Sequence, residues 1–237
     1  MILQSFDFSR LIGVALNQSF VIILFFLMSY LILRRNKNRL SKTFASFYLC
    51  EAVGFIFGML YLPFKINLLA NILYFFAILF IFFGPTLLLT FLLILLQSEV
   101  IFTKKKQMII LSIYFMIYLI ILLIIGLLLE GFQINESTGW RPHYSLPFFM
   151  FLVTYVSTIV VPTMYFSITI YQKFQNPQLK SRWVQFLIGM VGFMFILYGL
   201  MLYIFWSNEL YRFIWGFISP AVIIFGYLIY RGTGRQL

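Results

Sequence analysis

Long apolar stretches recur along this chain, and short basic clusters separate them. The clearest clusters are Arg34-Arg35-Asn36-Lys37-Asn38-Arg39, Lys104-Lys105-Lys106 and Lys180-Ser181-Arg182. An apolar helix of about 20 residues spans the hydrocarbon core of a bilayer, and basic loops remain on its cytoplasmic side. The alternation therefore predicts an all-α integral membrane bundle of transmembrane helices.

The apolar stretches are long enough for seven transmembrane helices, which we expect to form one domain over residues 1–237. The expected spans are Leu11–Leu33, Thr43–Leu62, Leu68–Leu96, Met108–Leu129, Leu146–Tyr171, Trp183–Trp206 and Phe213–Tyr230. The polar linker Ser207–Arg212 predicts a turn between the last two spans. Pro85, Pro162 and Pro220 lie inside three spans and predict kinks.

Composition agrees with a chain that lies in a lipid bilayer. Of the 237 residues, 63% are hydrophobic and 10% are charged, which is more apolar surface than a soluble core of this size can bury. The net charge of +11 would suit nucleic acid, but the basic residues lie between the spans. We therefore attribute the charge to orientation in the membrane and expect no nucleic-acid partner.

The distribution of the basic residues predicts the topology. If the N-terminus lies outside, most of the 17 Lys and Arg residues fall in cytoplasmic segments. Only four fall outside, namely Arg10, Lys65, Arg141 and Arg212. We therefore expect a multi-pass protein of the cell membrane whose C-terminus is cytoplasmic.

Glu51 is the most informative polar residue, because it lies near the middle of the second span. An ionised carboxylate is costly at that depth, so we expect a neutral acid that donates a hydrogen bond. It either forms part of a ligand or proton site, or bonds to a neighbouring hydroxyl as a structural residue. Gly54 and Gly58 follow at a spacing that favours close helix packing.

Other polar residues are expected to lie at a similar depth and could line a midplane cavity with Glu51. Alternatively, each hydroxyl bonds to the backbone of its own helix. In the outer loop, aromatic and basic residues suggest a lid over an outward-facing pocket, where Arg141 suits an anionic ligand group. The candidate ligand-binding residues are Glu51, Thr86, Ser157, Tyr198, Ser219, Trp140, Arg141 and His143.

The sequence excludes several kinds of chemistry. Cys50 is the single cysteine and His143 the single histidine, so an intrachain disulfide and a multi-cysteine metal site are excluded. The last span contains no lysine for a retinal Schiff base, and serine hydrolysis would need a histidine or lysine base at depth, which the expected spans lack. We expect no enzymatic activity, no metal and no cofactor.

The order of several segments carries a resemblance to a known family. These segments are the basic Arg34–Lys42, the aromatic Phe44–Leu62, Ala77–Glu99 with Gly84-Pro85, the outer Thr138–Tyr144, Leu179–Arg182 and Ser219-Pro220. Together they resemble the seven-helix N-terminal sensor region of prokaryotic histidine kinases. The resemblance implies a membrane-embedded sensory module. The sequence contains no phosphoacceptor or ATP-binding segment, so we expect either a stand-alone member or a shortened one, without kinase activity.

These features lead to one expected function and two alternatives. We expect a sensor or receptor-like protein that binds a small apolar or amphipathic ligand and signals through its cytoplasmic loops to a partner. The first alternative is a small proton-coupled secondary transporter in which Glu51 titrates. Transporters often contain two structurally repeated halves with interrupted helices in matching positions. Here Pro85 and Pro220 match in position between the two halves, but Pro162 has no counterpart in the first span, which argues against a transporter. The second alternative is a membrane scaffold that does not signal.

Overall fold

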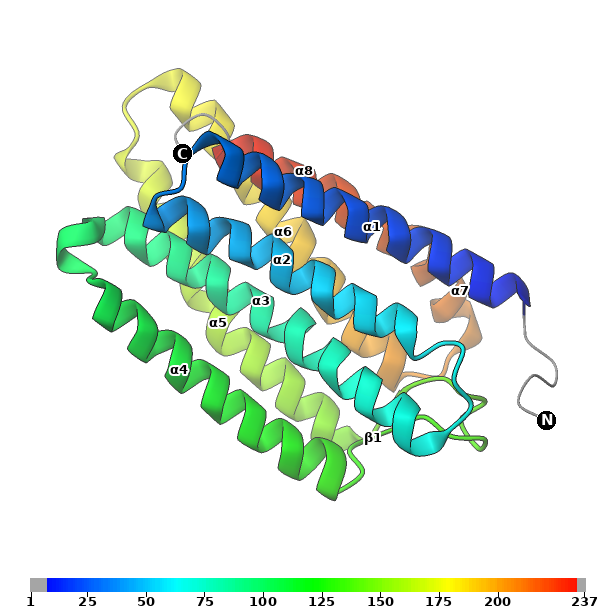
Figure 1. Ribbon diagram of the computed structural model, residues 1–237. Helices are drawn as coiled ribbons and strands as arrows, with labels where there is room; N and C mark the ends of the chain where they lie inside the picture. Colours follow the sequence, from blue (N-terminus) through cyan, green and yellow to red (C-terminus); the bar gives the residue numbers. More distant parts are fainter. Residues whose placement is uncertain (1–7, 234–237) are drawn as a thin grey trace.

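Long helices run up and down the molecule as a bundle, and a small hairpin covers one end (Figure 1). The computed structural model describes residues 8–233, with side chains for 14–97 and 101–233. The elements are α1 (Phe8–Arg35), α2 (Arg39–Leu60), α3 (Asn67–Ile101), α4 (Lys104–Ile121), the π-helix η1 (Leu122–Leu128), β1 (Phe132–Gln133), β2 (His143–Tyr144), α5 (Leu146–Lys173), α6 (Pro177–Phe205), α7 (Glu209–Ile218), the 3-10 turn η2 (Ser219–Ala221) and α8 (Val222–Thr233).

The prediction of a seven-helix all-α bundle is confirmed. Seven helical segments are long and apolar enough to cross a membrane. The fourth consists of α4 with η1, and the seventh consists of α7, η2 and α8. The expected turn before the last span is also present, since helix is interrupted over residues 206–208.

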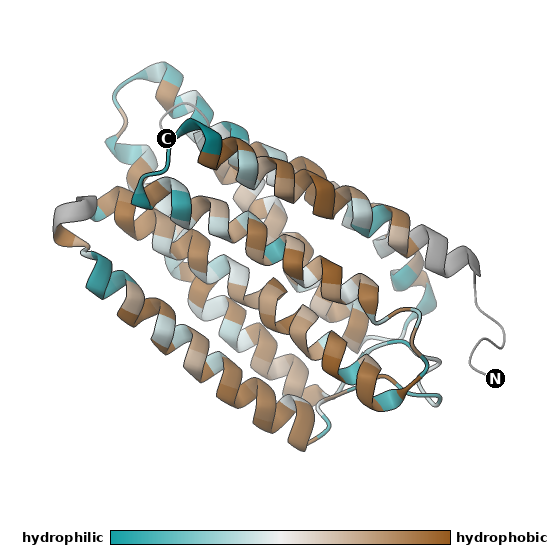
Figure 2. Ribbon diagram, in the orientation of Figure 1, coloured by the Kyte–Doolittle hydropathy of each residue, from teal (hydrophilic) through white to brown (hydrophobic). Residues whose placement is uncertain are grey.

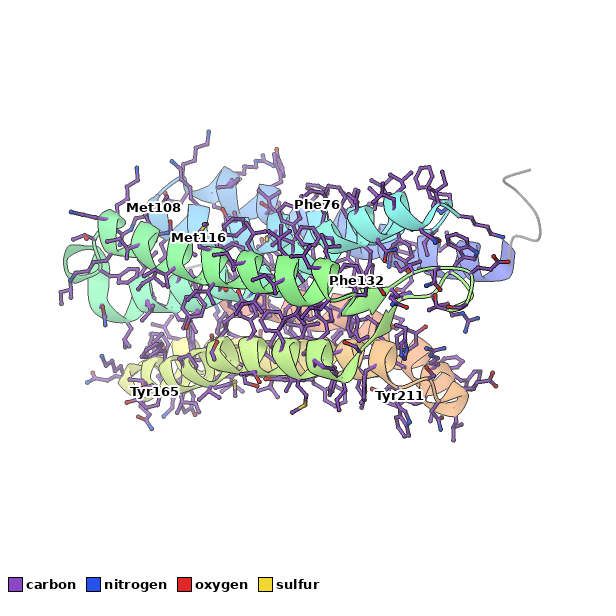
Figure 3. All side chains as sticks on the ribbon, turned by 90° about the horizontal axis from the view of Figure 1, so that it is seen from below. Phe76, Met108, Met116, Phe132, Tyr165 and Tyr211 are labelled. Atoms are coloured by element: carbon purple, nitrogen blue, oxygen red, sulfur yellow. The ribbon has the colours of Figure 1, made fainter. Side chains whose placement is uncertain are left out.

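The surface of the bundle suits a lipid environment. Apolar residues fill the middle of the helices, and polar residues gather at both ends (Figure 2). Many large apolar side chains project outward, among them Met108 and Met116 of α4 and Tyr165 of α5 (Figure 3). In water such side chains would form an unfavourable apolar surface, whereas acyl chains solvate them.

The two ends of the bundle differ in character. At one end, called the basic end below, α1 joins α2, α3 joins α4, α5 joins α6, and α8 finishes. The other end, called the hairpin end, holds the connection from α2 to α3, the β1–β2 hairpin and the segment before α7. Figure 1 shows that α1 starts at the hairpin end and that α8 finishes at the basic end.

Glycines allow the closest helix contacts, as is common between membrane helices. On α2, a Cβ at Gly54 would lie 2.9 Å from the backbone nitrogen of Ile81 on α3. On α6, a Cβ at Gly189 would lie 2.7 Å from the backbone nitrogen of Ile229 on α8. The backbones of α6 and α8 therefore touch, and this contact is called the α6–α8 seam below.

The three prolines behave differently from one another. Pro85 and Pro162 lie inside α3 and α5, which continue as helices on both sides of them. Pro220 lies in η2, where the hydrogen-bond pattern changes and the last span divides into α7 and α8. Of the expected kinks, the one at Pro220 thus coincides with a break in the helix.

The hairpin is hydrogen-bonded to the first turns of α3, which begins at Asn67. Phe132 pairs with Tyr144 and Gln133 with His143 in an antiparallel register. The side chain of Asn71 accepts from the backbone nitrogen of Ile134 at 3.1 Å and donates to the same residue's carbonyl at 3.2 Å. These bonds hold the segment that follows, residues 135–142, over the end of the bundle.

Candidate ligand-binding site

A cavity of about 460 Å³ opens at the hairpin end, between α1, α2, α6 and α7. Its size is within the range of small-molecule sites. The lining residues are Val14, Asn17, Gln18, Val21, Phe55, Tyr61, Leu62, Arg141, Pro142, Ile196, Leu200, Tyr203, Ile204, Arg212, Trp215, Gly216, Ser219 and Val222. Most of the wall is apolar or aromatic, and a few polar groups reach into it.

Two arginines give the cavity a positive charge. Arg141 comes from the hairpin and Arg212 from α7, and the described lining contains no Asp or Glu beside them. The guanidinium carbon of Arg212 lies 5.8 Å from the centre of the Tyr203 ring, which is within the range of a cation–π contact. Guanidinium groups bind carboxylate, sulfonate and phosphate oxygens through paired hydrogen bonds. The cavity is therefore suited to an anionic group.

Three buried polar atoms on this wall have no hydrogen-bond partner among the residues that the structure describes. They are Nε of Arg212, the indole Nε1 of Trp215 and Oε1 of Gln18. Trp215 is only 4% exposed, so its N–H has little access to bulk water. Buried polar atoms are nearly always bonded in folded proteins. These two donors and one acceptor are therefore available to a polar group that enters the cavity.

Trp215 is held in place by α6 and by its own helix. Its ring occupies the space that a Cβ of Gly199 would fill. One turn earlier, the Tyr211 hydroxyl donates to the carbonyl of Gly199 at 3.1 Å, and the Tyr211 ring stacks on Trp215 with 5.9 Å between centroids. Asn208 caps α7 by accepting from the backbone nitrogen of Tyr211 at 3.0 Å.

Arg141 is positioned by a tight turn within the hairpin. Gly139 and Trp140 have φ values of 59° and 58°, and the backbone nitrogen of Trp140 donates to the carbonyl of Asn135 at 2.9 Å. Glycine adopts this left-handed conformation easily, whereas it is uncommon for tryptophan. The turn directs the chain back across the end of the bundle, where Arg141 and Pro142 meet the cavity.

The structure brings only two of the eight candidate residues to this cavity, namely Arg141 and Ser219. From the same outer loop, Trp140 is half-buried against the apolar core. His143 lies exposed in β2, where it pairs with Gln133. Of the outer loop, Arg141 and Pro142 line the cavity, whereas Trp140 and His143 lie outside its lining.

The expected midplane cluster does not assemble around one cavity. Thr86 lies 3.4 Å from the hydroxyl of Tyr155, and Ser157 lies 2.7 Å from the hydroxyl of Tyr198. Glu51, Thr86, Ser157 and Tyr198 all lie outside the lining of the cavity described above. The reason is helical geometry, since two positions along α5 separate Tyr155 from Ser157 and so direct them to different faces. Similar depth in the bilayer did not bring these groups together.

Glu51 is fully buried between α2 and α3. Its side chain fills the space that a Cβ of Gly84 would occupy, and neither carboxylate oxygen has a hydrogen-bond partner among the described side chains. Pro85 follows directly and lacks an N–H, so the carbonyl of Ile81 on the same face of α3 loses its helical donor. The neighbouring thiol of Cys50 donates to the carbonyl of Phe80 at 3.3 Å. An acid in this place can hold a proton, but it lies apart from the cavity.

Gln18, Arg212 and Trp215 line the cavity but are not among the residues predicted from the sequence to bind a ligand. Arg212 belongs to the predicted turn and, like Arg141, to the few basic residues on the expected outer side. That shared side was the available signal, because two outer arginines in separate loops can converge at one end of the bundle. Trp215 lies in an apolar run and resembles a lipid-facing residue. Gln18 lies within the first expected span, and no sequence pattern there predicted a site residue.

Comparisons with protein-family models, with curated proteins and with solved structures gave no match to this chain. The function proposed below therefore rests on the geometry of the cavity.

Proposed function

We propose that this protein is a membrane receptor for a small amphipathic molecule with an anionic group. The observation that carries the proposal is the cavity at the hairpin end, with two arginines, three unpartnered polar atoms and an apolar wall. The anionic group would lie between Arg141 and Arg212, and the apolar part would contact the wall formed by α1 and α6. In this arrangement, the indole N–H of Trp215 also donates to the ligand.

The position of the cavity supports a receptor that transmits its occupancy along the last span. The lining continues from Arg212 in α7 through Ser219 in η2 to Val222 in α8. A ligand therefore contacts both sides of the 3-10 turn. A joint shift of α6 and α8, which the α6–α8 seam holds together, relative to α1 would change the arrangement at the basic end, where a cytoplasmic partner would detect it. Such a response is a shift in population between two arrangements of the bundle.

The topology and the resemblance both agree with this proposal. With the basic end in the cytoplasm, the cavity opens toward the outside of the cell membrane. The loop with Gly139, Trp140 and Pro142 and the Ser219-Pro220 pair belong to the resemblance with sensor regions of histidine kinases. Those same segments line the cavity or lie next to it.

Photolabelling in lipid nanodiscs tests the proposal. The probe is octanesulfonate with a diazirine on its alkyl chain, and the nanodiscs contain only phosphatidylcholine. We expect saturable labelling of residues in α7 and α1, blocked by unlabelled octanesulfonate. The double variant R141Q/R212Q should lower the affinity by about tenfold or more, because each charge-assisted hydrogen bond contributes about 1.5–3 kcal/mol.

Matched controls separate the site from general attraction to charge. Lys65→Gln removes a basic residue at the same end that does not line the cavity, so its labelling should equal that of the wild type. Octanol and octyltrimethylammonium have the same alkyl chain without the anion and should compete poorly. Equal competition by octanol, or unchanged labelling of R141Q/R212Q, would contradict the proposal.

Glu51 supports one second candidate, a proton-coupled carrier. A fully buried acid without hydrogen-bond partners can exchange a proton when its surroundings open. A carrier would move octanesulfonate, which stays ionised, into phosphatidylcholine proteoliposomes under an imposed pH gradient. Gradient-dependent uptake that Glu51→Gln abolishes would favour the carrier. Saturable binding without uptake, unchanged in Glu51→Gln, would favour the receptor.

A further inference from the structure

A second cavity, of about 780 Å³, lies at the basic end between α1, α6 and α8. Three arginines from three different helices line it, namely Arg35, Arg182 and Arg231. The other lining residues are Pro177, Gln178, Ser181, Gln185, Tyr227 and Tyr230, so the described lining holds no acidic residue. Basic residues are expected at a cytoplasmic end, but their convergence on one concave site needs a further explanation.

One face of α6 supplies hydrogen-bonding groups at regular spacing. Gln178, Ser181, Arg182 and Gln185 are three or four positions apart, and side chains so spaced share a helix face. Within the described part of the chain, Oε1 of Gln185 is buried without a hydrogen-bond partner. This wall therefore presents the guanidinium of Arg182, the hydroxyl of Ser181 and the acceptor Oε1 of Gln185.

The opposite wall comes from α8 and the end of α1. Tyr227, Tyr230 and Arg231 also share one helix face, and the guanidinium of Arg35 lies 5.2 Å from the centre of the Tyr230 ring. Next to Arg231, a Cβ at Gly232 would be 2.5 Å from the backbone nitrogen of Phe186. This contact at the end of the α6–α8 seam brings Arg231 close to the residues around Gln185.

We propose that this cavity binds the phosphate group of an anionic phospholipid with a hydroxylated headgroup, such as phosphatidylglycerol. Three guanidinium groups and the hydroxyls of Ser181 and Tyr227 are donors suited to phosphate oxygens. The acceptor Oε1 of Gln185 then receives a hydrogen bond from a headgroup hydroxyl. The site lies where the helices end, which is the depth of lipid headgroups. It is independent of the function assigned to the other cavity.

Native mass spectrometry of the detergent-solubilised protein tests the proposal. Dioctanoyl phosphatidylglycerol and dioctanoyl phosphatidylcholine are titrated separately, and we expect the first to bind at least tenfold more tightly. Arg182→Gln and Arg231→Gln should each lower the phosphatidylglycerol affinity by about tenfold, because a charged hydrogen bond is lost. Gln185→Leu should lower it less and should leave the affinity for dioctanoyl phosphatidate unchanged. A thermal melt of each variant confirms that it is folded.

The control removes the same kind of charge from the same end of the bundle. The triple variant K104Q/K105Q/K106Q alters three basic residues outside this cavity, and it should bind phosphatidylglycerol as the wild type does. Glycerol 3-phosphate tests a soluble source of the same chemistry. Displacement of the lipid by an equal concentration of glycerol 3-phosphate would overturn the lipid assignment. An affinity lowered as strongly by the triple lysine variant as by Arg182→Gln would overturn the site.

Discussion

The indole ring of Trp215 lies directly on the Cα of Gly199, in space that any larger residue at position 199 would fill. The absence of a side chain on α6 thus fixes the orientation of a tryptophan on α7. Because Trp215 lines the cavity, the shape of the cavity depends on this contact.

Gly199→Ala should therefore disturb both the fold and the cavity. The added methyl displaces the indole, and we expect a loss of about 1–3 kcal/mol in stability from overpacking. Octanesulfonate binding should weaken with it. Gly216→Ala is the control for stability only, because Gly216 itself lines the cavity. A Cβ there meets nothing within 4 Å, and alanine should stabilise α7 by about 0.5–1 kcal/mol. Thermal melts compare the two variants, and photolabelling compares Gly199→Ala with the wild type. Equal melting of the two variants would contradict the role of the Gly199 contact.

Gly84 and Glu51 should show strong energetic coupling. A Cβ at Gly84 would lie 2.9 Å from the carboxyl carbon of Glu51, so Gly84→Ala should destabilise the protein by about 1–3 kcal/mol. Glu51→Ala removes the obstructing atoms, so the double variant should lose less stability than the sum of the single variants. We expect a coupling energy of about 1–3 kcal/mol in a double-mutant cycle. Gly58→Ala, whose nearest neighbour would be at 3.7 Å, should be nearly neutral.

Glu51→Met should raise the stability of the bundle. Methionine matches the unbranched glutamate chain and removes two buried oxygens that lack hydrogen bonds. The penalty for such an unsatisfied polar group is about 1–3 kcal/mol, and we expect a gain within that range in heat-induced unfolding. A loss of stability of similar size would instead show that the carboxyl group makes a stabilising hydrogen bond in the folded protein.

Asn71→Ala should loosen the hairpin that carries Arg141. The variant loses both hydrogen bonds between Asn71 and Ile134, each of which contributes about 0.5–1.5 kcal/mol. Faster amide hydrogen exchange is expected at residues 132–144, together with weaker octanesulfonate binding. Glu136→Gln changes an exposed residue of the same loop and should leave both measurements as in the wild type. Unchanged exchange in Asn71→Ala would show that other contacts hold the hairpin, such as the 2.9 Å hydrogen bond between the hydroxyls of Tyr74 and Tyr144.

The seven spans were predictable because the thickness of the bilayer fixes the length of an apolar helix. The grouping of the polar residues was not predictable in this way, because the depth of a residue in the bilayer does not determine which face of its helix it lies on. Thr86 and Ser157 lie at similar expected depths, yet they bond to different tyrosines. The hairpin was also missed, since two-residue strands such as Phe132–Gln133 leave no clear sequence period. Both Arg141 and Trp215 line the cavity, but only Arg141 stands out in the sequence, because it is a charged residue in a largely apolar chain.

The short 3-10 turn at Ser219–Ala221 determines how much of the chain must move when the ligand cavity changes shape. The last span covers 25 residues, but α7 accounts for only 10 of them. Beyond the turn, α8 is held against α6 by direct backbone contact at Gly189 and Gly232. Moving α7 alone exposes far less apolar surface than moving an uninterrupted helix of the same span. The cavity can therefore change shape while the α6–α8 seam stays closed.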